Sequence, residues 1–310
     1  MHMRSSLLVD VLTDVLQRSR ARGAAFSHTT VHGEWGVQFQ SGKGLSVHAI
    51  VAGEAHLWAG SPDDALRLMA GDIVLVRESQ LHELAHAPGA ACIPFHDLPL
   101  DATGRLRVVD GGGPETVFFC GAYDFEGDLC RPILDSLPSA VRLRPSAGST
   151  LRLTMDLLGR EMLRDEPGQQ ALLDRLLDVA LVQVLREHLS APGTDAPAWF
   201  RASADPHIGP ALYALHADPA RQWTVASLAA EAALSRSAFA RRFHELVGVA
   251  PLAYLTDWRM ALAREQLRDG DAGLAAIAQS LGYASEFSFA AAFKRHEGVA
   301  PGRWRAAVRS

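Results

Sequence analysis

The sequence predicts an α+β protein with two domains: a β-barrel completed by a helical hairpin, and an all-helical domain made of two helix-turn-helix units. Three observations lead to this prediction. Short apolar runs separated by Gly, Pro and His fill residues 24–120, a pattern typical of an all-β barrel or sandwich. The apolar spacing becomes helical after Ser149. Near the C-terminus, one short pattern occurs twice with an offset of fifty residues.

Length and composition indicate a globular protein. A chain of 310 residues suggests about two domains, and 48% hydrophobic with 21% charged residues allows sizeable cores. The sequence has no run of about 18 apolar residues, so we expect no membrane segment. Aspartates interrupt the apolar stretch of residues 7–16, which argues against a signal peptide, and three cysteines form no disulfide framework. We therefore expect a cytoplasmic protein.

Charge is distributed unevenly along the chain, whose net charge is −5. Residues 206–310 contain 12 Lys and Arg against 9 Asp and Glu, whereas residues 1–205 contain 18 against 26. The C-terminal part is thus mildly basic and the remainder is acidic. This difference indicates that the two parts have different functions.

The N-terminal part is expected to begin with an amphipathic helix over residues 7–20, with Leu8, Val11, Leu12, Val15 and Leu16 on one face. Short strands should follow. The predicted strands are Trp35–Phe39, Leu45–Val51, Ala55–Trp58, Ile73–Val76, Ala91–Phe95 and Thr116–Cys120.

Two apolar stripes after Ser149 predict a helical hairpin, interrupted at Pro167-Gly168. The second stripe, between residues 172 and 185, is wide enough for two partners, such as the barrel and a second subunit. The alternative is a hairpin that packs only on its own domain. Residues 190–207 are rich in Pro, Gly and Ala and predict a connector between domains.

The repeated pattern predicts a duplicated helix-turn-helix. Ser235–Phe243 recurs as Ser285–Phe293, and Gly248-x2-Pro251 recurs fifty residues later. Serine suits the N-cap of each second helix, glycine its C-terminal end, and proline the start of the next helix. The helix between the two units should end near Asp269. At nineteen residues it would be about 28 Å long, which is comparable to one DNA turn of about 34 Å.

The C-terminal segment resembles the AraC/XylS family of transcription regulators over about 85 residues. The matching motifs are Leu228-Ala229, Ser235-x3-Phe239-x-Arg241-x-Phe243, Gly248-x2-Pro251-x2-Tyr254-Leu255, Arg259-Met260-x-Leu262-Ala263, Ile277-Ala278-x2-Leu281-Gly282-Tyr283-x-Ser285, Phe289-x3-Phe293-Lys294 and Gly298-x2-Pro301-x2-Trp304-Arg305. The resemblance implies a sequence-specific regulator that places two recognition helices in the major groove of double-stranded DNA. Activation, with RNA polymerase as a further partner, is the expected mode of action.

The resemblance also implies which residues face DNA. In the first unit they are Arg236, Ser237, Ala240 and Arg241; in the second they are Glu286, Phe287, Ser288 and Ala291, followed by Lys294 and Arg295. The second unit departs from the family, which often has a small or polar residue in place of Phe287 and an arginine in place of Ala291. We therefore expect Arg241 to dominate hydrogen-bonded readout. Phe287 should contact thymine methyl groups, while Lys294 and Arg295 contact phosphates.

The N-terminal part resembles cupin sensor domains. Gly42-x5-His48-x-Ile50-x3-Glu54 and Gly71-x10-His82 match the two cupin motifs, and Cys120–Phe125 and Leu137-Pro138 match cupin domains that precede AraC-type modules. This resemblance implies a small-molecule effector bound in the barrel and a homodimer formed through the helical hairpin. The expected divisions are a sensor and dimerisation domain over 1–190, a linker over 191–207 and a DNA-binding domain over 208–310.

Metal binding is an open alternative for this domain. His48, Glu54 and His82 match three of the four usual cupin ligands, but Ile50 replaces a histidine, so we expect a degenerate site and assign no cofactor. A divalent metal in the barrel, or a metal-dependent cupin enzyme fused to a DNA-binding module, is the alternative. We expect that the protein is not an enzyme, because the DNA-binding unit explains the chain without catalysis.

Redox sensing is a second alternative. Cys92 and Cys120 both fall on predicted strands and could lie near each other in the barrel. A cysteine on a strand is more often an inert core residue, and the sequence shows no basic cluster that would lower its pKa.

Overall fold

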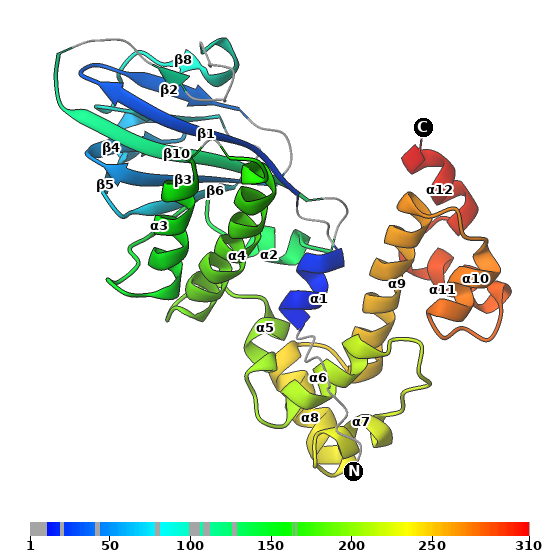
Figure 1. Ribbon diagram of the computed structural model, residues 1–310. Coiled ribbons are helices and arrows are strands. Elements are labelled where there is room, and N and C mark those ends of the chain that lie inside the picture. The colour runs from blue at the N-terminus through cyan, green and yellow to red at the C-terminus, as the bar shows by residue number, and fades with distance from the viewer. Residues whose placement is uncertain are drawn as a thin grey trace. The chain divides into compact units, whose positions relative to one another are not determined.

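The computed structural model describes residues 11–18, 22–40, 44–77, 81–98, 106–107, 112–125, 129–162, 164 and 166–309. Contacts divide the chain into two compact units (Figure 1). The sensor unit comprises Ala21–Phe125 and Ile133–Asp195. The helical unit comprises Met1–Arg20, Glu126–Pro132 and Ala196–Ser310.

Two β-sheets form the sensor unit. The first has six strands in the order β11-β6-β3-β10-β1-β9, and the second has five in the order β5-β4-β7-β2-β8. The strands are β1 (Arg22–His32), β2 (Gly36–Phe39), β3 (Gly44–Ala52), β4 (Glu54–Trp58), β5 (Leu66–Met69), β6 (Ile73–Arg77), β7 (His82–Ala85), β8 (Ile93–Pro94), β9 (Leu106–Arg107), β10 (Glu115–Asp124) and β11 (Ala140–Leu143). This arrangement confirms the predicted β-rich domain.

The core of the sensor unit contains side chains from both sheets. Alternate residues of each strand point to one face, so Ile50 and Phe118 of the first sheet meet Val37 and Leu57 of the second. The rings of Trp35 and Phe118 stack with centroids 5.1 Å apart. The sheets therefore bury one face each against the other.

Five of the predicted strands correspond to β2, β3, β4, β6 and β10. The run Ala91–Phe95 is shorter than predicted, because only Ile93 and Pro94 pair, beside β2, before a 3₁₀ turn. Strand β1 was not predicted. Its Ala, Ser, Thr and His residues carry little apolar signal, and its antiparallel pairing with β10 defines it instead.

Helices α3 (Thr150–Met162) and α4 (Gln169–Ser190) pack against each other as the predicted hairpin. They are separated where predicted, and Gly168 has φ +89°. Helix α4 contacts β1 and β11 and buries Leu177, Leu181 and Leu185. The hydroxyl of buried Tyr123, on β10, donates a hydrogen bond to the carbonyl oxygen of Leu177 over 2.8 Å.

The helical unit contains most of the remaining helices (Figure 1). They are α1 (Val11–Arg18), α5 (Ala198–Ser203), α6 (Ile208–Ala217), α7 (Val225–Glu231), α8 (Arg236–Val247), α9 (Pro251–Asp269), α10 (Leu274–Ser280), α11 (Glu286–Glu297) and α12 (Pro301–Arg309); α2 (Arg131–Ser136) crosses the boundary between units. The predicted linker helix corresponds to α9, with the same last residue. None of the described helices is both long enough and apolar enough to cross a membrane.

Helix α1 packs against α5 and α6. Val11, Leu12, Val15 and Leu16 are buried as predicted, whereas the predicted Leu8 and the predicted ends of this helix lie outside the described residues. Buried Asp14 lies 3.1 Å from His216, whose other ring nitrogen lies 2.8 Å from the Tyr254 hydroxyl. The contacts thus group α1 with the helical unit, and α5 lies within the expected linker; the expected domain boundaries remain predictions.

Candidate functional site

The first helix-turn-helix consists of α7, a short turn and α8. The Thr224 hydroxyl accepts the Ser227 N–H at 3.0 Å and the Ser235 hydroxyl accepts the Ala238 N–H at 3.3 Å, so each helix is capped by its own sequence. Ala233 turns the chain with φ +51°. These local interactions set the direction in which α8 leaves the turn.

The second unit repeats this packing in three dimensions. The rings of Phe239 and Phe243 have centroids 5.6 Å apart, and those of Phe289 and Phe293 are 5.7 Å apart. Each second phenylalanine also meets an aromatic ring of the following helix edge to face: Phe243 meets Tyr254 at 5.8 Å and Phe293 meets Trp304 at 6.0 Å. The two aromatic cores are therefore equivalent at the fifty-residue offset.

Besides the connecting helix α9, direct contacts join the two helix-turn-helix units. Arg259 of α9 donates to the carbonyl oxygens of Pro219 (2.8 Å) and Arg221 (3.0 Å) in the loop before α7. Gln222 of the same loop donates to the Gly282 carbonyl oxygen over 2.6 Å. Gly282 has φ +78°, and a Cβ there would lie 2.1 Å from the Ala220 oxygen. These contacts fix the spacing of the two recognition helices.

In the first unit, the predicted DNA-facing residues lie along α8. Arg236, Ser237 and Arg241 are exposed, while Ala240 is half-buried. The nearest acid to Arg241 is Glu245, at 3.9 Å between highly exposed side chains, a separation that leaves the guanidinium available to a partner.

The neighbouring Arg242 is engaged elsewhere. It pairs with the carboxylate of Asp205 at 2.5 Å, and Asp205 also accepts the N–H groups of His207 and Ile208 at the start of α6. The hydrogen bond from Arg242 holds the pKa of the Asp205 carboxyl well below its usual range. Arg242 therefore anchors α8 to α6.

In the second unit, Glu286, Phe287, Ser288 and Ala291 are all exposed on α11. Phe287 is 78% exposed, the largest exposed fraction among the large hydrophobic side chains of the described residues. Burying such a ring against an apolar partner would be favourable by about 1.5–3 kcal/mol. Lys294 and Arg295 are exposed further along the same helix. Ser288 belongs to the N-terminal capping box, since its hydroxyl accepts the Ser285 N–H at 3.1 Å.

The predicted sensor residues separate into two groups. His48 Nε2 lies 2.8 Å from His82 Nε2, and His48 Nδ1 lies 2.7 Å from Cys120 Sγ. All three side chains are buried. Glu54 does not join them but pairs with Arg67 at 2.5 Å, both side chains being largely exposed. The sequence indicated Cys120 as a candidate redox residue but gave no sign of its contact with His48.

This cluster of His48, His82 and Cys120 is enclosed by aromatic surface. The Phe39 ring lies 4.6 Å from the His48 ring and 5.4 Å from the His82 ring. Burial, and secondarily His82, lowers the pKa of His48 well below its usual value, so His48 is neutral. Within the described residues, no group of three or more His, Cys, Asp and Glu side chains is arranged to hold a metal ion.

The cysteines are all free. Cys120 lies on β10 as predicted, whereas Cys92 precedes β8 rather than lying on a strand. Burial, and then the charge of Glu83, raises the pKa of the Cys92 thiol to about 11. Cys92 is therefore protonated at neutral pH.

Comparison with known proteins identifies the family. A family model described as cupin matches residues 10–190, and one described as a helix-turn-helix domain matches residues 228–307. A putative AraC-like transcription regulator of Streptomyces lividans is 34% identical over 300 residues, spanning 96% of this chain and 98% of that protein. The chain belongs to the family of AraC-like transcription regulators. It is a DNA-binding regulator with an N-terminal cupin domain.

The chain is also similar to two further proteins. The RCS-specific HTH-type transcriptional activator RclR of Escherichia coli is 28% identical over 97% of this chain and 99% of its own length. The crystallised DNA-binding domain of AdpA, in complex with a target DNA, is 35% identical and covers 34% of this chain and 95% of that domain, with a TM-score of 0.32.

Proposed function

We propose that the regulator is an effector-controlled activator that reads DNA mainly through α8 of its first helix-turn-helix. The observation that supports this proposal is the contrast between the two recognition helices. Helix α8 presents the exposed guanidinium of Arg241, whereas the first turns of α11 present Glu286, Phe287 and small side chains and no cation. A guanidinium can recognise guanine through two hydrogen bonds, and a phenyl ring cannot.

A gel-shift titration tests this assignment. The operator is first obtained by sequencing DNA recovered with the protein. Replacing Arg241 with Ala should weaken specific binding by roughly 1–3 kcal/mol and relax base preference at one position. Arg67→Ala, in the sensor unit, is the matched control and should leave the affinity unchanged. Equal operator affinity of the Arg241→Ala variant and the wild type would refute the assignment.

We also infer a homodimer formed through the helical hairpin. Four large apolar side chains of α3 and α4 are about half exposed: Leu153, Leu157, Leu172 and Val179. They are spaced by four residues on α3 and by seven on α4, so each pair lies on one helix face. An apolar face of this kind on a regulator suits a second copy of the chain.

The same proposal includes a small-molecule effector, RNA polymerase as a partner, and the cytoplasm as the compartment. The relative RclR is described as an activator, and we propose that this regulator also activates transcription, by contacting RNA polymerase. We place the regulator in the cytoplasm, where its DNA partner would be, and assign it a binding role without catalysis. Transcription in vitro from the recovered operator, with purified RNA polymerase, should rise when the regulator is added.

A second candidate signal is thiol oxidation at Cys120. The 2.7 Å contact of its sulfur with His48 supports this candidate, because a neutral imidazole nitrogen can accept a hydrogen bond from the thiol. RclR, described as RCS-specific, is a relative over almost the whole chain. A two-electron oxidant such as hypochlorous acid would transfer oxygen to the thiol, giving sulfenic acid and releasing chloride and a proton.

This candidate is tested by comparing Cys120→Ser with Cys92→Ser. Promoter activation by hypochlorous acid should be lost only in the first variant. Mass spectrometry of trapped sulfenic acid should show the modification at Cys120. Normal activation by hypochlorous acid in a Cys92→Ser/Cys120→Ser double variant would eliminate sensing through these two thiols.

A further inference from the structure

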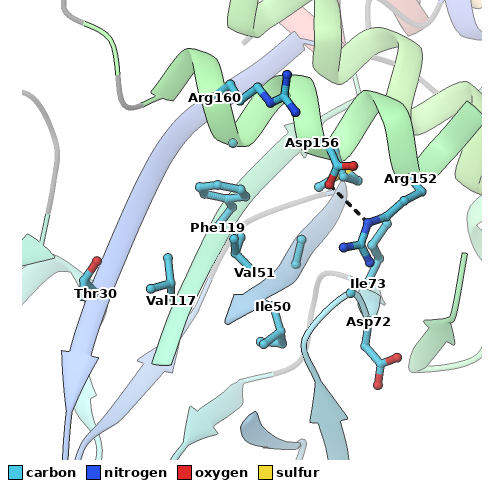
Figure 2. Close-up of a pocket in the computed structure, with 14 residues that line it drawn as sticks. Thr30, Ile50, Val51, Asp72, Ile73, Val117, Phe119, Arg152, Asp156 and Arg160 are labelled. Atoms are coloured by element: carbon cyan, nitrogen blue, oxygen red, sulfur yellow. Dashed lines mark hydrogen bonds and ion pairs between the residues drawn. The ribbon is translucent and has the colours of Figure 1, made fainter. Parts of the chain in front are cut away.

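A cavity of about 570 Å³ lies between the first sheet and α3 (Figure 2). It is on the face opposite the core. On β10, Phe118 and Cys120 belong to the core between the sheets, whereas the alternate residues Val117 and Phe119 line the cavity together with Val51 of β3. Its volume is in the range of small-molecule binding sites, which is about 300–1,000 Å³.

The floor of this cavity is apolar, and its roof carries two arginines and one aspartate. Val51, Val117 and Phe119 extend from β3 and β10 beneath α3, which carries Arg152 and Arg160 at the cavity (Figure 2). Helix α3 approaches the sheet closely at Gly159, where a Cβ would lie 3.2 Å from the Phe119 ring.

Among the described residues, one cation at the cavity lacks an ion-pair partner. Arg152 donates to Asp156 of the same helix over 3.2 Å, and Asp72 pairs with Arg144 at 2.9 Å. Arg160 has no ion-pair partner among the described residues. A bound anion would therefore be attracted to α3, and a carboxylate matches the geometry of a guanidinium.

We propose that this cavity binds an amphiphile with one carboxylate and an apolar body, and that this compound is the effector of the regulator. The carboxylate pairs with Arg160, and the apolar body covers Val51, Val117 and Phe119. The effector role rests on the proposed function as an effector-controlled regulator, whereas binding itself does not. Since α3 also carries Leu153 and Leu157 of the proposed dimer face, occupancy of the cavity connects ligand binding to dimer geometry.

Calorimetric titration of the full chain with decanoate, far below its micellar concentration, tests the binding. We expect one site per chain. Decan-1-ol and decyltrimethylammonium should bind at least roughly tenfold more weakly than decanoate, because they lack the carboxylate. Equal binding of the three compounds would overturn the proposal.

Two variants locate the site. Arg160→Gln removes an exposed charge without disturbing the core and should weaken decanoate binding about tenfold while leaving decan-1-ol unaffected. Val51→Trp, at a position that is 45% exposed, should fill the cavity and abolish binding of both compounds. Arg175→Gln, on α4 outside the cavity, is the matched control. Unchanged decanoate binding in both cavity variants would overturn the site.

The remaining measurements separate this proposal from the proposed function. Operator affinity is measured without decanoate. If the protein binds its operator but not decanoate, the proposed function stands and the proposed ligand site is refuted. Decanoate that binds but changes neither operator affinity nor transcription would overturn the effector role. Light scattering tests whether a second copy of the chain, instead of a ligand, covers the cavity. If Val51→Trp or Arg160→Gln dissociates a dimer, a second copy covers this surface and the proposal fails.

Discussion

At the scale of single residues, the most unusual side chain is Phe287. A phenyl ring that is 78% exposed on a recognition helix gains free energy only when a partner covers it. In the major groove the apolar partner is the thymine methyl group. For this physical reason we propose that the ring contacts thymine.

Replacing operator thymines by deoxyuridine tests this role. Loss of one contacted methyl group should cost the wild type about 0.8 kcal/mol, or roughly a fourfold loss of affinity. Phe287→Ala should bind the thymine operator more weakly and show no further loss with deoxyuridine. Gel-shift titration of both proteins on both DNAs measures the coupling. Equal sensitivity of the two proteins to deoxyuridine would show that Phe287 contacts no methyl group.

Cys92 illustrates how burial determines reactivity at the same scale. With the pKa of its thiol raised to about 11, the thiolate fraction at neutral pH is very small. In a Cys120→Ser/Cys130→Ser variant, alkylation of Cys92 by iodoacetamide should accelerate about tenfold per pH unit up to about pH 11. An unperturbed thiol levels off near pH 8.5. A Cys92 rate that also levels off near pH 8.5 would contradict this assignment.

At the scale of elements, the junction between the two helix-turn-helix units depends on a turn. Gly282 combines φ +78° with a direct approach to the Ala220 carbonyl oxygen. Arg259 and Gln222 complete the junction. Because both units contact it, the junction keeps α8 and α11 at one spacing, as DNA recognition by two helices requires.

Gly282→Ala should therefore lower the free energy of unfolding by more than backbone strain alone would. The control is Gly298→Ala, because Gly298 has φ +79° and a Cβ there meets nothing within 4 Å. The control should lose about 1–2 kcal/mol of unfolding free energy from the left-handed backbone. Gly282→Ala should lose more and should also weaken operator binding. Urea unfolding and gel shifts provide both measurements. Equal losses of unfolding free energy and of operator affinity in the two variants would show that the junction contributes to neither.

At the scale of the whole molecule, the prediction concerns assembly. Leu153→Glu/Leu157→Glu should convert a dimer to a monomer, because each buried leucine contributes about 1.5–3 kcal/mol and a buried unpaired carboxylate is unfavourable. Light scattering coupled to size exclusion measures the mass. Met69→Glu, which replaces another exposed apolar residue of the sensor unit, is the control. A dimer that survives the double substitution would place the interface elsewhere.

Patterns within short segments made most of the helices predictable. The serine caps, the Gly-x2-Pro exits and the phenylalanines four residues apart specify α8, α9 and α11 through contacts that lie close in sequence. Strands with apolar residues, such as β3 and β6, were predicted for the same reason. Strand β1 was missed because its partner β10 is about ninety residues away in sequence, and pairing at that separation leaves little local signal.

The sequence by itself determined the family and the two-part architecture and predicted the residues that contact DNA, because these depend on residue types at fixed spacings. The tertiary structure decided which of those residues meet. It separated Glu54 from His48 and His82, joined Cys120 to His48, and brought Arg259 and Gln222 to the junction at Gly282. It also formed the cavity beneath α3. The physical reason is that such contacts connect distant segments, whose approach depends on the packing of whole sheets and helices.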